Sequence, residues 1–473
     1  MSAKVLIANR GAVVPRVIES CRRLELGVAV VHSDADAEGA WLDLADDVHA
    51  LGGEAPADSY LSIPKLLEAA AATGATAVHP GYGFLSENPA FASAVRAAGL
   101  CFIGPDARWL EAMGHKTEAR RLMAGQGMPM GASSGLLGPD AAEARAAAAA
   151  IGYPVLVKPA QGGGGIGMLA AHDAAELDKA LERARTMAAR SFGSAEIYLE
   201  RLMERPRHVE FQILADGRGG AVCLSERDCS LQRRHQKVIE EAPAPGLDRA
   251  EVTALGDRIA GMLGSLGYDN LGTVEMLWEE GAGFAFLEVN TRLQVEHAVT
   301  EEVTGTDIVA AQIRLALGEP LDQVLPRRPE VRGHAVQARI YAEDPVRFLP
   351  SAGRLSRFKT PVAEAVRVYT GYREGGRVTP FYDPLVAKVI ARGATRDEAL
   401  DRLDGALAGF VVEGIKTNIP FLRRAIGHPA FRAGRVHTGL TPEILASGRQ
   451  PPEKNIPRGI PQKKRGDVPW PTQ

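Results

Sequence analysis

The stretch that most constrains the fold is residues 271–297, LGTVEMLWEEGAGFAFLEVNTRLQVEH. Two apolar, β-prone runs, TVEMLW and FAFLEV, are joined by the glycine-containing turn EEGAG, and this order predicts a β-hairpin. If the hairpin folds symmetrically about its turn, Glu275 and Glu288 face each other. Like charges directly opposite each other destabilise a sheet. A divalent cation between them would remove that cost, because Mg²⁺ takes carboxylate oxygens and substrate phosphates as ligands.

Polar side chains alternate along the second strand of this hairpin and beyond it. Every second side chain of an extended segment lies on one face. If the segment stays extended, the polar face holds Glu288, Asn290, Arg292, Gln294 and Glu296. A solvated edge strand would alternate in the same way. The mixture of metal-type ligands, a fixed cation, an amide and a candidate base favours a site with metal-nucleotide at one end and a small anion at the other.

Length and composition are those of an ordinary multidomain globular chain. The 473 residues indicate about three domains, and 55 Lys+Arg against 58 Asp+Glu give a formal net charge of −3. This balance argues against nucleic acid as a main partner. The four cysteines lack metal or disulfide-framework spacing. The start resembles no signal peptide, and no apolar run approaches the roughly 20 residues that span a bilayer. We therefore expect a cytoplasmic protein with no membrane partner.

Residues 1–113 predict one α/β domain. KVLIANRG reads as a buried strand, a helical period follows, and VAVVHSD reads as a second strand, which predicts a β-α-β unit with a parallel sheet. The segment HPGYGF places Tyr82 and Gly83 in a glycine-rich loop after a strand. Such a loop lines a ligand crevice in many α/β sheets and is elsewhere a plain turn.

Two lysines and a glycine run follow. A predicted helix over 114–130 carries Lys116, which by itself predicts a solvated side chain. Lys158 lies on a strand just before the glycines of 162–167, which formally match G-x-G-x-x-G. That motif must open a helix, but the next helix starts only near Asp173, and Met168 stands where a Walker A motif requires Lys. Two interpretations of the glycine run are left. It is either a flexible hairpin whose N–H groups fold over phosphates or a purely structural loop.

The segments from residue 207 onward, outside the central hairpin, show weaker patterns. RHVEFQILAD (207–216) alternates, and a lone His208 is more often structural than a ligand. Residues 226–246 are dense in charge and poor in regular period, which fits either a charged surface loop or a segment that handles anions. A helix is expected over 248–266. Short strands with Gly/Pro turns follow after 330, with an amphipathic helix begun by Thr395, and residues 447–473 predict a disordered or draped tail.

Together these stretches resemble the biotin carboxylase family of the ATP-grasp superfamily. The matching stretches are IANRG, HPGYGFLSEN, KPAQGGGGIGM, ERDCSLQRRHQKVIEEAPAPG, EVNTRLQVEH, RGHAVQARIYAEDP and EGIKTN. The resemblance implies a multidomain α/β and α+β fold. Its parts would be a Rossmann-like pre-ATP-grasp domain (1–113), an ATP-grasp domain (114–330) with a mobile lid at about 131–203, and a C-terminal α+β domain (331–446). It also implies a ligase that uses ATP and bicarbonate to carboxylate biotin by way of carboxyphosphate.

The resemblance assigns roles by motif. ATP would contact Lys116, Lys158, Gly163, Gly164, Gly165, Glu200, Arg201, Met203, His208, Gln232, His235, Glu275 and Glu288. Two Mg²⁺ or Mn²⁺ ions would bind Glu275, Glu288 and Asn290. Bicarbonate would bind Lys237, Arg292, Gln294 and Val295, and biotin would bind Tyr82, Gly83 and Arg339. The catalytic groups would be Glu296 as general base, Arg339 as stabiliser of the biotin enolate, Lys237 and Arg292.

Partners follow from the same resemblance. The sequence holds no Met-Lys-Met biotinylation motif and no carboxyltransferase-sized region. We therefore expect a homodimer served by a separate biotin carboxyl carrier protein and carboxyltransferase subunits, as in an acetyl-CoA carboxylase of fatty acid biosynthesis. One alternative is a biotin-independent ATP-grasp ligase that forms an acyl phosphate. Another is a non-catalytic ATP-binding regulatory subunit, which should have lost a metal ligand or the base, and none is lost.

Five positions depart from the family pattern. They are Ala12 for Glu, His115 for an acid, Gln161 for Gly, Ile166 for a basic residue and Ala298 for Pro. Ile166 removes a lid charge that would meet phosphate, which bears on ATP affinity or lid closure. None of the five removes a predicted catalytic group.

Overall fold

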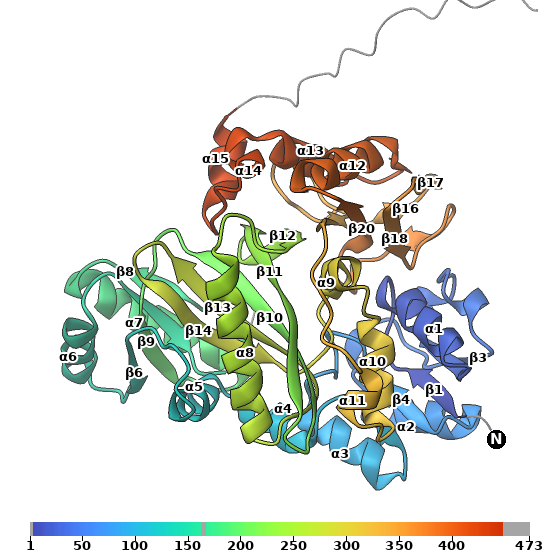
Figure 1. The fold of residues 1–473 in the computed structure, drawn as a ribbon, viewed down its shortest axis with the longest axis horizontal. Helices are drawn as coiled ribbons and strands as arrows, with labels where there is room; N and C mark the ends of the chain where they lie inside the picture. The colour runs from blue at the N-terminus through green and yellow to red at the C-terminus, as the bar shows by residue number, and fades with distance from the viewer. Residues whose placement is uncertain (1–2, 162–166, 448–473) are drawn as a thin grey trace, which may run out of the picture.

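A five-stranded parallel sheet forms the N-terminal part of the chain (Figure 1), in a computed structural model that describes residues 3–161 and 167–447. In spatial order its strands are β3 (Asp47–Ala50), β2 (Gly27–His32), β1 (Lys4–Ile7), β4 (Ala77–His79) and β5 (Cys101–Phe102). The helices here are α1 (Val13–Arg23), η1 (Asp34–Asp36), η2 (Leu42–Leu44), η3 (Pro56–Asp58), α2 (Ile63–Thr73), α3 (Pro89–Ala97) and α4 (Ala107–Gly114). The predicted parallel β-α-β start is confirmed.

A smaller antiparallel sheet forms the segment predicted as a lid. Its order is β6 (Ser133–Leu136), β9 (Ile197–Arg201), β7 (Val155–Pro159) and β8 (Leu169–Ala171), and its helices are α6 (Ala141–Ile151) and α7 (Ala174–Phe192). Helix α5 (Lys116–Gly125) precedes this sheet and is shorter than the predicted 114–130. Helix α7 begins after Asp173, whose side chain accepts from the N–H groups of Ala175 and Glu176, as an N-cap does.

The largest sheet has eight antiparallel strands and runs through the middle of the molecule. Their order is β14 (Gly283–Asn290), β13 (Asp269–Glu279), β10 (Arg207–Asp216), β11 (Ala221–Arg233), β12 (Gln236–Ala242), β15 (His334–Tyr341), β20 (Leu385–Gly393) and β18 (Val366–Thr370). Helix α8 (Arg249–Ser265) lies along β10 and β11 (Figure 1). Because β12 pairs with β15, strands from both sides of residue 330 share one sheet.

The remaining elements lie along this sheet, some against β10 and β13 and others against β15 and β20. They are α9 (His297–Thr304), α10 (Ile308–Ala316), α11 (Leu321–Val324), β16 (Gly353–Arg354), β17 (Arg357–Lys359), β19 (Arg377–Val378), α12 (Arg396–Gly409), β21 (Val411–Glu413), α13 (Ile419–Gly427), α14 (Pro429–Arg432) and α15 (Leu440–Ala446). Thr395 caps α12 as predicted, its side chain accepting from the Glu398 N–H. The predicted tail from 448 onward lies outside the described residues.

The central hairpin forms with Glu275 directly opposite Glu288, as predicted. The pairing is not symmetric about the turn, because a register shift between Glu275 and Met276 sets Glu288, and not Leu287, opposite Glu275. The assumption that the chain stays extended to Glu296 is wrong. Strand β14 ends at Asn290, and the chain turns before α9 begins at His297. The surface-loop alternative for 226–246 is also wrong, because residues 226–242 lie mostly in buried strands β11 and β12.

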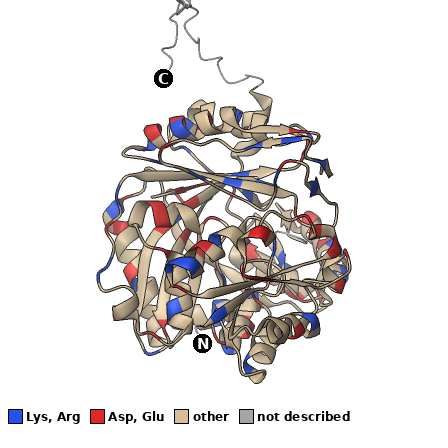
Figure 2. Cartoon of the chain, turned by 90° about the vertical axis from the view of Figure 1, so that its right-hand side faces the viewer, with Lys and Arg blue, Asp and Glu red and all other residues tan. Residues whose placement is uncertain are grey.

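Charged side chains of both signs are interspersed over the elements seen in Figure 2. Within residues 3–161 and 167–447, no helix combines the length and the apolarity that crossing a bilayer requires.

Candidate active site

Two adjoining cavities lie along the large sheet. The first, called here the lid cavity, has a volume of about 430 Å³ and is lined by the lid sheet on one side and by β13 and β14 on the other. The second, the charged cavity, has a volume of about 600 Å³ and is lined by residues of all three predicted domains. Both cavities share four lining residues, His208, His235, Glu275 and Glu288. A ligand that fills the lid cavity therefore reaches the charged cavity at these four side chains.

The lid cavity combines an apolar surface with a few buried charges. Its apolar lining includes Leu156, Met168, Leu202, Met203, Leu277 and Leu287. Lys158 is buried, and its Nζ lies 2.9 Å from Glu200 Oε2 and 5.6 Å from the centre of the Tyr198 ring. Burial opposes the charge of Lys158, but Glu200 outweighs it and raises the pKa of the lysine. A flat heteroaromatic ring fits the apolar wall, and phosphates fit the lysine end.

The two carboxylates of the hairpin stand where both cavities meet. Among the described residues, Lys116 is the one cation within 4.0 Å of Glu288, with its Nζ at 4.0 Å. Asn290 Oδ1 accepts one bond from Arg292 Nη2 at 2.9 Å and keeps a second lone pair. A weakly compensated Glu288, opposite a second carboxylate and beside a free carbonyl lone pair, completes a donor set that fits Mg²⁺. Glu275, Glu288 and Asn290 would hold the ion.

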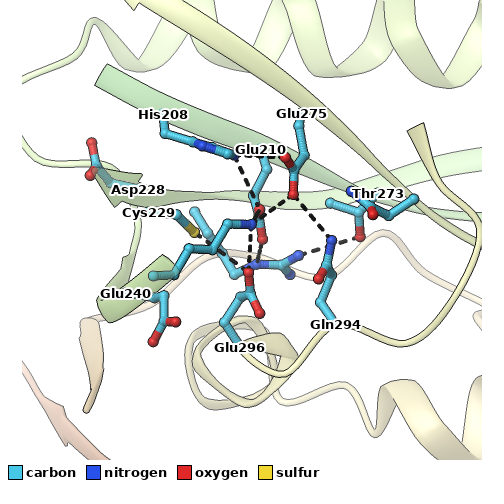
Figure 3. A network of polar contacts seen from close by, with 12 residues as sticks. His208, Glu210, Asp228, Cys229, Glu240, Thr273, Glu275, Gln294 and Glu296 are labelled. Atoms are coloured by element: carbon cyan, nitrogen blue, oxygen red, sulfur yellow. Dashed lines mark hydrogen bonds and ion pairs between the residues drawn. The ribbon is translucent and has the colours of Figure 1, made fainter. Parts of the chain in front are cut away.

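A lysine whose side chain is 12% exposed joins three carboxylates in the charged cavity, Glu210, Glu275 and Glu296, which are labelled in Figure 3. Lys237 Nζ lies 2.7 Å from Glu275 Oε1 and 2.7 Å from Glu296 Oε1, and it also contacts Glu210. Burial works against this cation, but the carboxylates hold the pKa of Lys237 well above its usual range. Arg227 lies beneath, donating to Glu210 and, at 2.8 Å, to Gln212. Residues 226–242, for which a charged surface loop and an anion-handling segment were both considered, thus contribute cations to a network in which charges of opposite sign neutralise one another.

Glu296 is held between two cations. Besides Lys237, it accepts from Arg339 Nη2 at 2.9 Å, and Arg339 also pairs with Glu240. The Glu296 side chain is 0% exposed. Burial alone would raise its pKa, yet Lys237, Arg339 and Arg227 hold it far below the usual range. The group is therefore an ionised carboxylate, the form in which it can accept a proton.

Arg292 is oriented from three sides at the entrance of this network. Its Nε donates to Glu87 Oε2 at 2.8 Å and its Nη1 donates to Gln294 Oε1 at 2.7 Å, in addition to the contact with Asn290. Gln294 Nε2 in turn lies 3.3 Å from Glu275 Oε1. A guanidinium fixed in this way can present its remaining N–H groups to a planar anion.

Aromatic side chains form the opposite wall of the charged cavity. Tyr82, Gly83 and Phe84 come from the loop after β4, and Phe381 and Tyr382 come from the turn before β20. The ring of Tyr382 lies 4.3 Å from the Arg10 guanidinium. Because this wall combines the first and last parts of the chain, the cavity exists only when the whole chain is folded.

Every predicted site residue that the structure describes lines one of the two cavities. The lid cavity holds Lys116, Lys158, Glu200, Arg201, Met203 and Gln232; the charged cavity holds Tyr82, Gly83, Lys237, Asn290, Arg292, Gln294, Val295, Glu296 and Arg339; the shared border holds His208, His235, Glu275 and Glu288. Gly163, Gly164, Gly165 and Ile166 lie outside the described residues. Val295, which strict alternation placed on the opposite face, lines the same cavity because the chain turns after Asn290.

Comparison with known proteins agrees with this geometry. Residues 1–110 match the biotin carboxylase N-terminal domain, 115–324 the ATP-binding domain of the carbamoyl-phosphate synthase L chain, and 337–443 the biotin carboxylase C-terminal domain. The chain is 46% identical over 453 residues to the biotin carboxylase of Halalkalibacterium halodurans, covering 95% of this chain and 100% of that one. It is 46% identical over 438 residues to the biotin carboxylase of Pseudomonas aeruginosa, covering 92% and 97%.

The chain belongs to the biotin carboxylase family. Its structure superimposes on the biotin carboxylase domain dimer of Hydrogenobacter thermophilus 2-oxoglutarate carboxylase, in complex with MgADP, ADP and bicarbonate, with a TM-score of 0.90, 37% identity and coverage of 94% of this chain and 99% of that one. The predicted family, ATP-grasp fold and enzyme class are confirmed.

Sequence reasoning missed several residues of this biotin carboxylase site. Glu87 orients Arg292 and also accepts from the Thr291 N–H at 3.0 Å, although it lies in one of the family-like stretches, HPGYGFLSEN. Glu210 and Glu240, both 0% exposed, neutralise Lys237 and Arg339. The segment of Glu210 showed only alternation and that of Glu240 only a high density of charge, and neither pattern distinguishes a buried charged face from a solvated one. Ala12, a departure from the family, lies on the lining of the charged cavity.

Proposed function

We propose that the two cavities carry out the two chemical steps of ATP-dependent biotin carboxylation, phosphoryl transfer to bicarbonate and carboxyl transfer to biotin. The observation that carries this proposal is their shared border. ATP in the lid cavity would direct its phosphates past Lys158 and Lys116 toward Glu275 and Glu288, and the next groups inward are Arg292 and Glu296. The γ-phosphoryl group and bicarbonate would therefore meet at the border.

Phosphoryl transfer needs charge compensation and a bound nucleotide. Magnesium, when held by Glu275, Glu288 and Asn290, neutralises charge on the transferring phosphoryl group. We extend the proposal to two Mg²⁺ or Mn²⁺ ions, since two carboxylates and an amide oxygen offer more ligand atoms than one ion with phosphates needs. Lys116 and Lys158 add positive charge from the lid side. In the proposal, the apolar residues beside Met203 enclose the adenine.

Bicarbonate is a poor nucleophile and must lose its proton as it attacks. Arg292, Gln294 and Lys237 would orient the anion with its hydroxyl toward Glu296. As the bond from the bicarbonate oxygen to phosphorus forms and the bond to ADP breaks, Glu296 takes the proton. Lys237 and Arg339 hold the pKa of Glu296 low, so in this proposal proton transfer accompanies the attack.

The second step uses the products of the first. Carboxyphosphate divides into CO₂ and phosphate, and the phosphate takes the proton of the biotin ureido nitrogen, which then bonds to the CO₂ carbon. The electrons pass through the ureido oxygen as an enolate. Arg339 is always charged and has no acceptor lone pair, so it suits that oxygen and not proton abstraction. Tyr82 and Gly83 would border the biotin ring.

Partners are proposed on the same basis. We infer that biotin arrives on a carrier protein, that carboxyltransferase subunits take the product, and that the chain forms a homodimer, as the Hydrogenobacter thermophilus domain does. We place the protein in the cytoplasm, where four free cysteines are stable. Relatives of similar identity include the propionyl-CoA carboxylase α chain of Ruegeria pomeroyi, at 41%, and the mouse methylcrotonoyl-CoA carboxylase α subunit, at 42%. Sequence identity to these relatives therefore does not identify the acyl acceptor of the full carboxylase.

The deciding experiment is bicarbonate-dependent ADP formation by the purified chain, with and without free biotin. Strong stimulation by biotin, with carboxybiotin as product, is the expected result. Stimulation only by an amine or another nucleophile would select the biotin-independent ligase, and no turnover would select the regulatory subunit.

A further inference from the structure

A buried lysine that the proposed chemistry does not use lies behind the charged cavity. Lys388 is in β20 and is 0% exposed. Within residues 3–161 and 167–447, its Nζ forms no ion pair, and its one hydrogen bond goes to a main-chain oxygen. Burying an ammonium without a paired anion is costly. A buried group that costs folding free energy suggests a function, and the contacts of Lys388 indicate which function that is.

Two of the three contacts of Lys388 are with residues that line the charged cavity. Its Nζ donates to the main-chain oxygen of Val295 at 3.0 Å. It also lies 5.8 Å from the centre of the Tyr82 ring and 5.3 Å from the centre of the Tyr369 ring, within the range of cation–π attraction. One ammonium from the C-terminal part of the chain therefore contacts both the turn that bears Glu296 and the loop that bears Tyr82.

The position of Lys388 in the sheet is as informative as its contacts. It stands directly opposite Arg339 on β15, and side chains of directly opposed residues lie on the same face. Arg339 reaches the Glu296 carboxylate, while Lys388 reaches the carbonyl of the residue before it. Two neighbouring strands thus send adjacent cations to consecutive residues of one turn. Adjacent like charges repel, so this arrangement costs folding free energy. A function for both cations would explain why the cost is kept.

We propose that Lys388 is a positioning residue for bicarbonate-dependent phosphoryl transfer, holding the Val295–Glu296 main chain in place from behind. The turn needs such support because regular structure stops at Asn290 and resumes at His297. Lys237 and Arg339 hold the carboxylate end of the Glu296 side chain and do not contact its main chain. Lys388 holds the main chain next to Glu296 by its bond to the Val295 carbonyl.

The charges around Lys388 leave its protonated form weakly stabilised. Burial lowers its pKa to about 7; Glu301 acts in the opposite direction, and Arg16 and Arg339 lower it further. Glu301 is already engaged by Arg16, with Nη2 to Oε1 at 2.6 Å. Nζ carries N–H groups in both its neutral and its charged form, so the bond to the Val295 carbonyl does not depend on the charge.

The test is Lys388→Met, which removes the ammonium but preserves the length of the side chain. Steady-state rates would be measured against bicarbonate and, separately, against MgATP. We expect a fall in kcat/KM for bicarbonate of about 10- to 100-fold, because small misplacements of reacting groups have effects of this order. The KM for ATP should stay within about twofold, and the melting temperature should be equal or higher, because an unpaired buried charge is gone.

A merely structural lysine gives a different pattern. In that case the melting temperature, the KM for ATP and the rate would all worsen together, and that result would overturn the proposal. Unchanged bicarbonate kinetics in a folded variant would overturn it as well. Tyr369→Phe serves as the matched control, because it keeps the ring beside Lys388 and removes only a hydroxyl bonded to Glu19 at 3.1 Å. Its bicarbonate kinetics should match the wild type.

Lys388→Gln provides a second variant, with an N–H donor but no charge. Its kcat/KM for bicarbonate should lie between the wild-type and Met values. If the Met variant does not fold, the Gln variant replaces it, and kcat/KM for bicarbonate and KM for ATP are compared in the same way. The inference rests on the proposed function, and the two fail separately. A wild-type chain without bicarbonate-dependent ATP cleavage would refute the function, whereas an active wild type with unaltered Lys388 variants would refute only the inference.

Discussion

The lid cavity and the charged cavity share a border but are built on different physical principles. The lid cavity depends on apolar walls and one buried Lys158–Glu200 pair. The charged cavity depends on a network in which Lys237 touches three carboxylates and Glu296 touches two cations. The first needs two sheets of neighbouring sequence, and the second needs residues from Asn9 to Leu385. Under the proposed function, nucleotide binding would depend mainly on residues 116–288, with Thr438 as the one C-terminal lining residue among those described, and carboxylation would depend on the assembled chain.

This difference predicts how many properties a single substitution alters in each cavity. In the lid cavity a change should alter affinity for ATP and little else, because apolar contacts are nearly independent of one another. In the charged cavity a change should alter several properties together, since removing one partner leaves another buried charge unpaired. Substitutions in both cavities test that contrast, from the largest expected effect to the smallest.

Glu296→Gln should have the largest effect. Gln cannot take the bicarbonate proton, so bicarbonate-dependent ATP cleavage and biotin carboxylation should both fall by about 100- to 10,000-fold. Stability should fall too, because Lys237 and Arg339 lose a shared anion. Phosphate release, carboxybiotin and melting temperature would be measured on the same samples.

The matched control is Glu240→Gln, which removes another 0% exposed carboxylate that also pairs with Arg339. It should lose stability to a comparable degree and keep far more ATP cleavage. Equal losses of ATP cleavage in both variants would assign Glu296 to packing alone.

Glu288→Gln should impair catalysis more than folding. The substitution removes a ligand for Mg²⁺ but also relieves the repulsion with Glu275, so the apparent affinity for Mg²⁺ should fall roughly 10- to 100-fold. The melting temperature without metal should be unchanged or higher. Glu280→Gln, in the exposed turn of the same hairpin, is the control and should behave as wild type. A large loss of metal-free stability with full turnover would show that Glu288 serves the fold and not the metal.

Met203→Ala should have the smallest effect and a narrow one. Losing apolar contact in the lid cavity should raise the KM for ATP about three- to tenfold, leaving the KM for bicarbonate and the ratio of carboxybiotin to ADP unaltered. Met187→Ala, at an exposed methionine on α7 of the same lid, controls for loss of a methionine. A change in the bicarbonate KM would break the contrast between the two cavities.

The parts that sequence reasoning predicted correctly are those set by local rules. The hairpin over 271–290 follows from its glycine-containing turn, although a register shift next to Glu275 is what sets that residue opposite Glu288. The start of α7 follows from a capping Asp173. Residues 226–242 were ambiguous because their burial depends on distant partners: Arg227 is neutralised by Glu210, and Asp228 by Arg207 at 2.7 Å. The turn after Asn290 was missed because Glu87, about 200 positions away, bonds to the main chain of Thr291.

The claim that Glu296 and Arg339 divide the reaction is tested most directly by the ratio of carboxybiotin formed to phosphate released in Arg339→Ala. Losing the guanidinium should remove enolate stabilisation and lower carboxybiotin about 100- to 1,000-fold. Phosphate release, which depends on Glu296 and Lys237, should fall much less, so the ratio drops at least about tenfold below the wild type. A folded Arg339→Ala variant whose ratio equals that of the wild type would contradict the account.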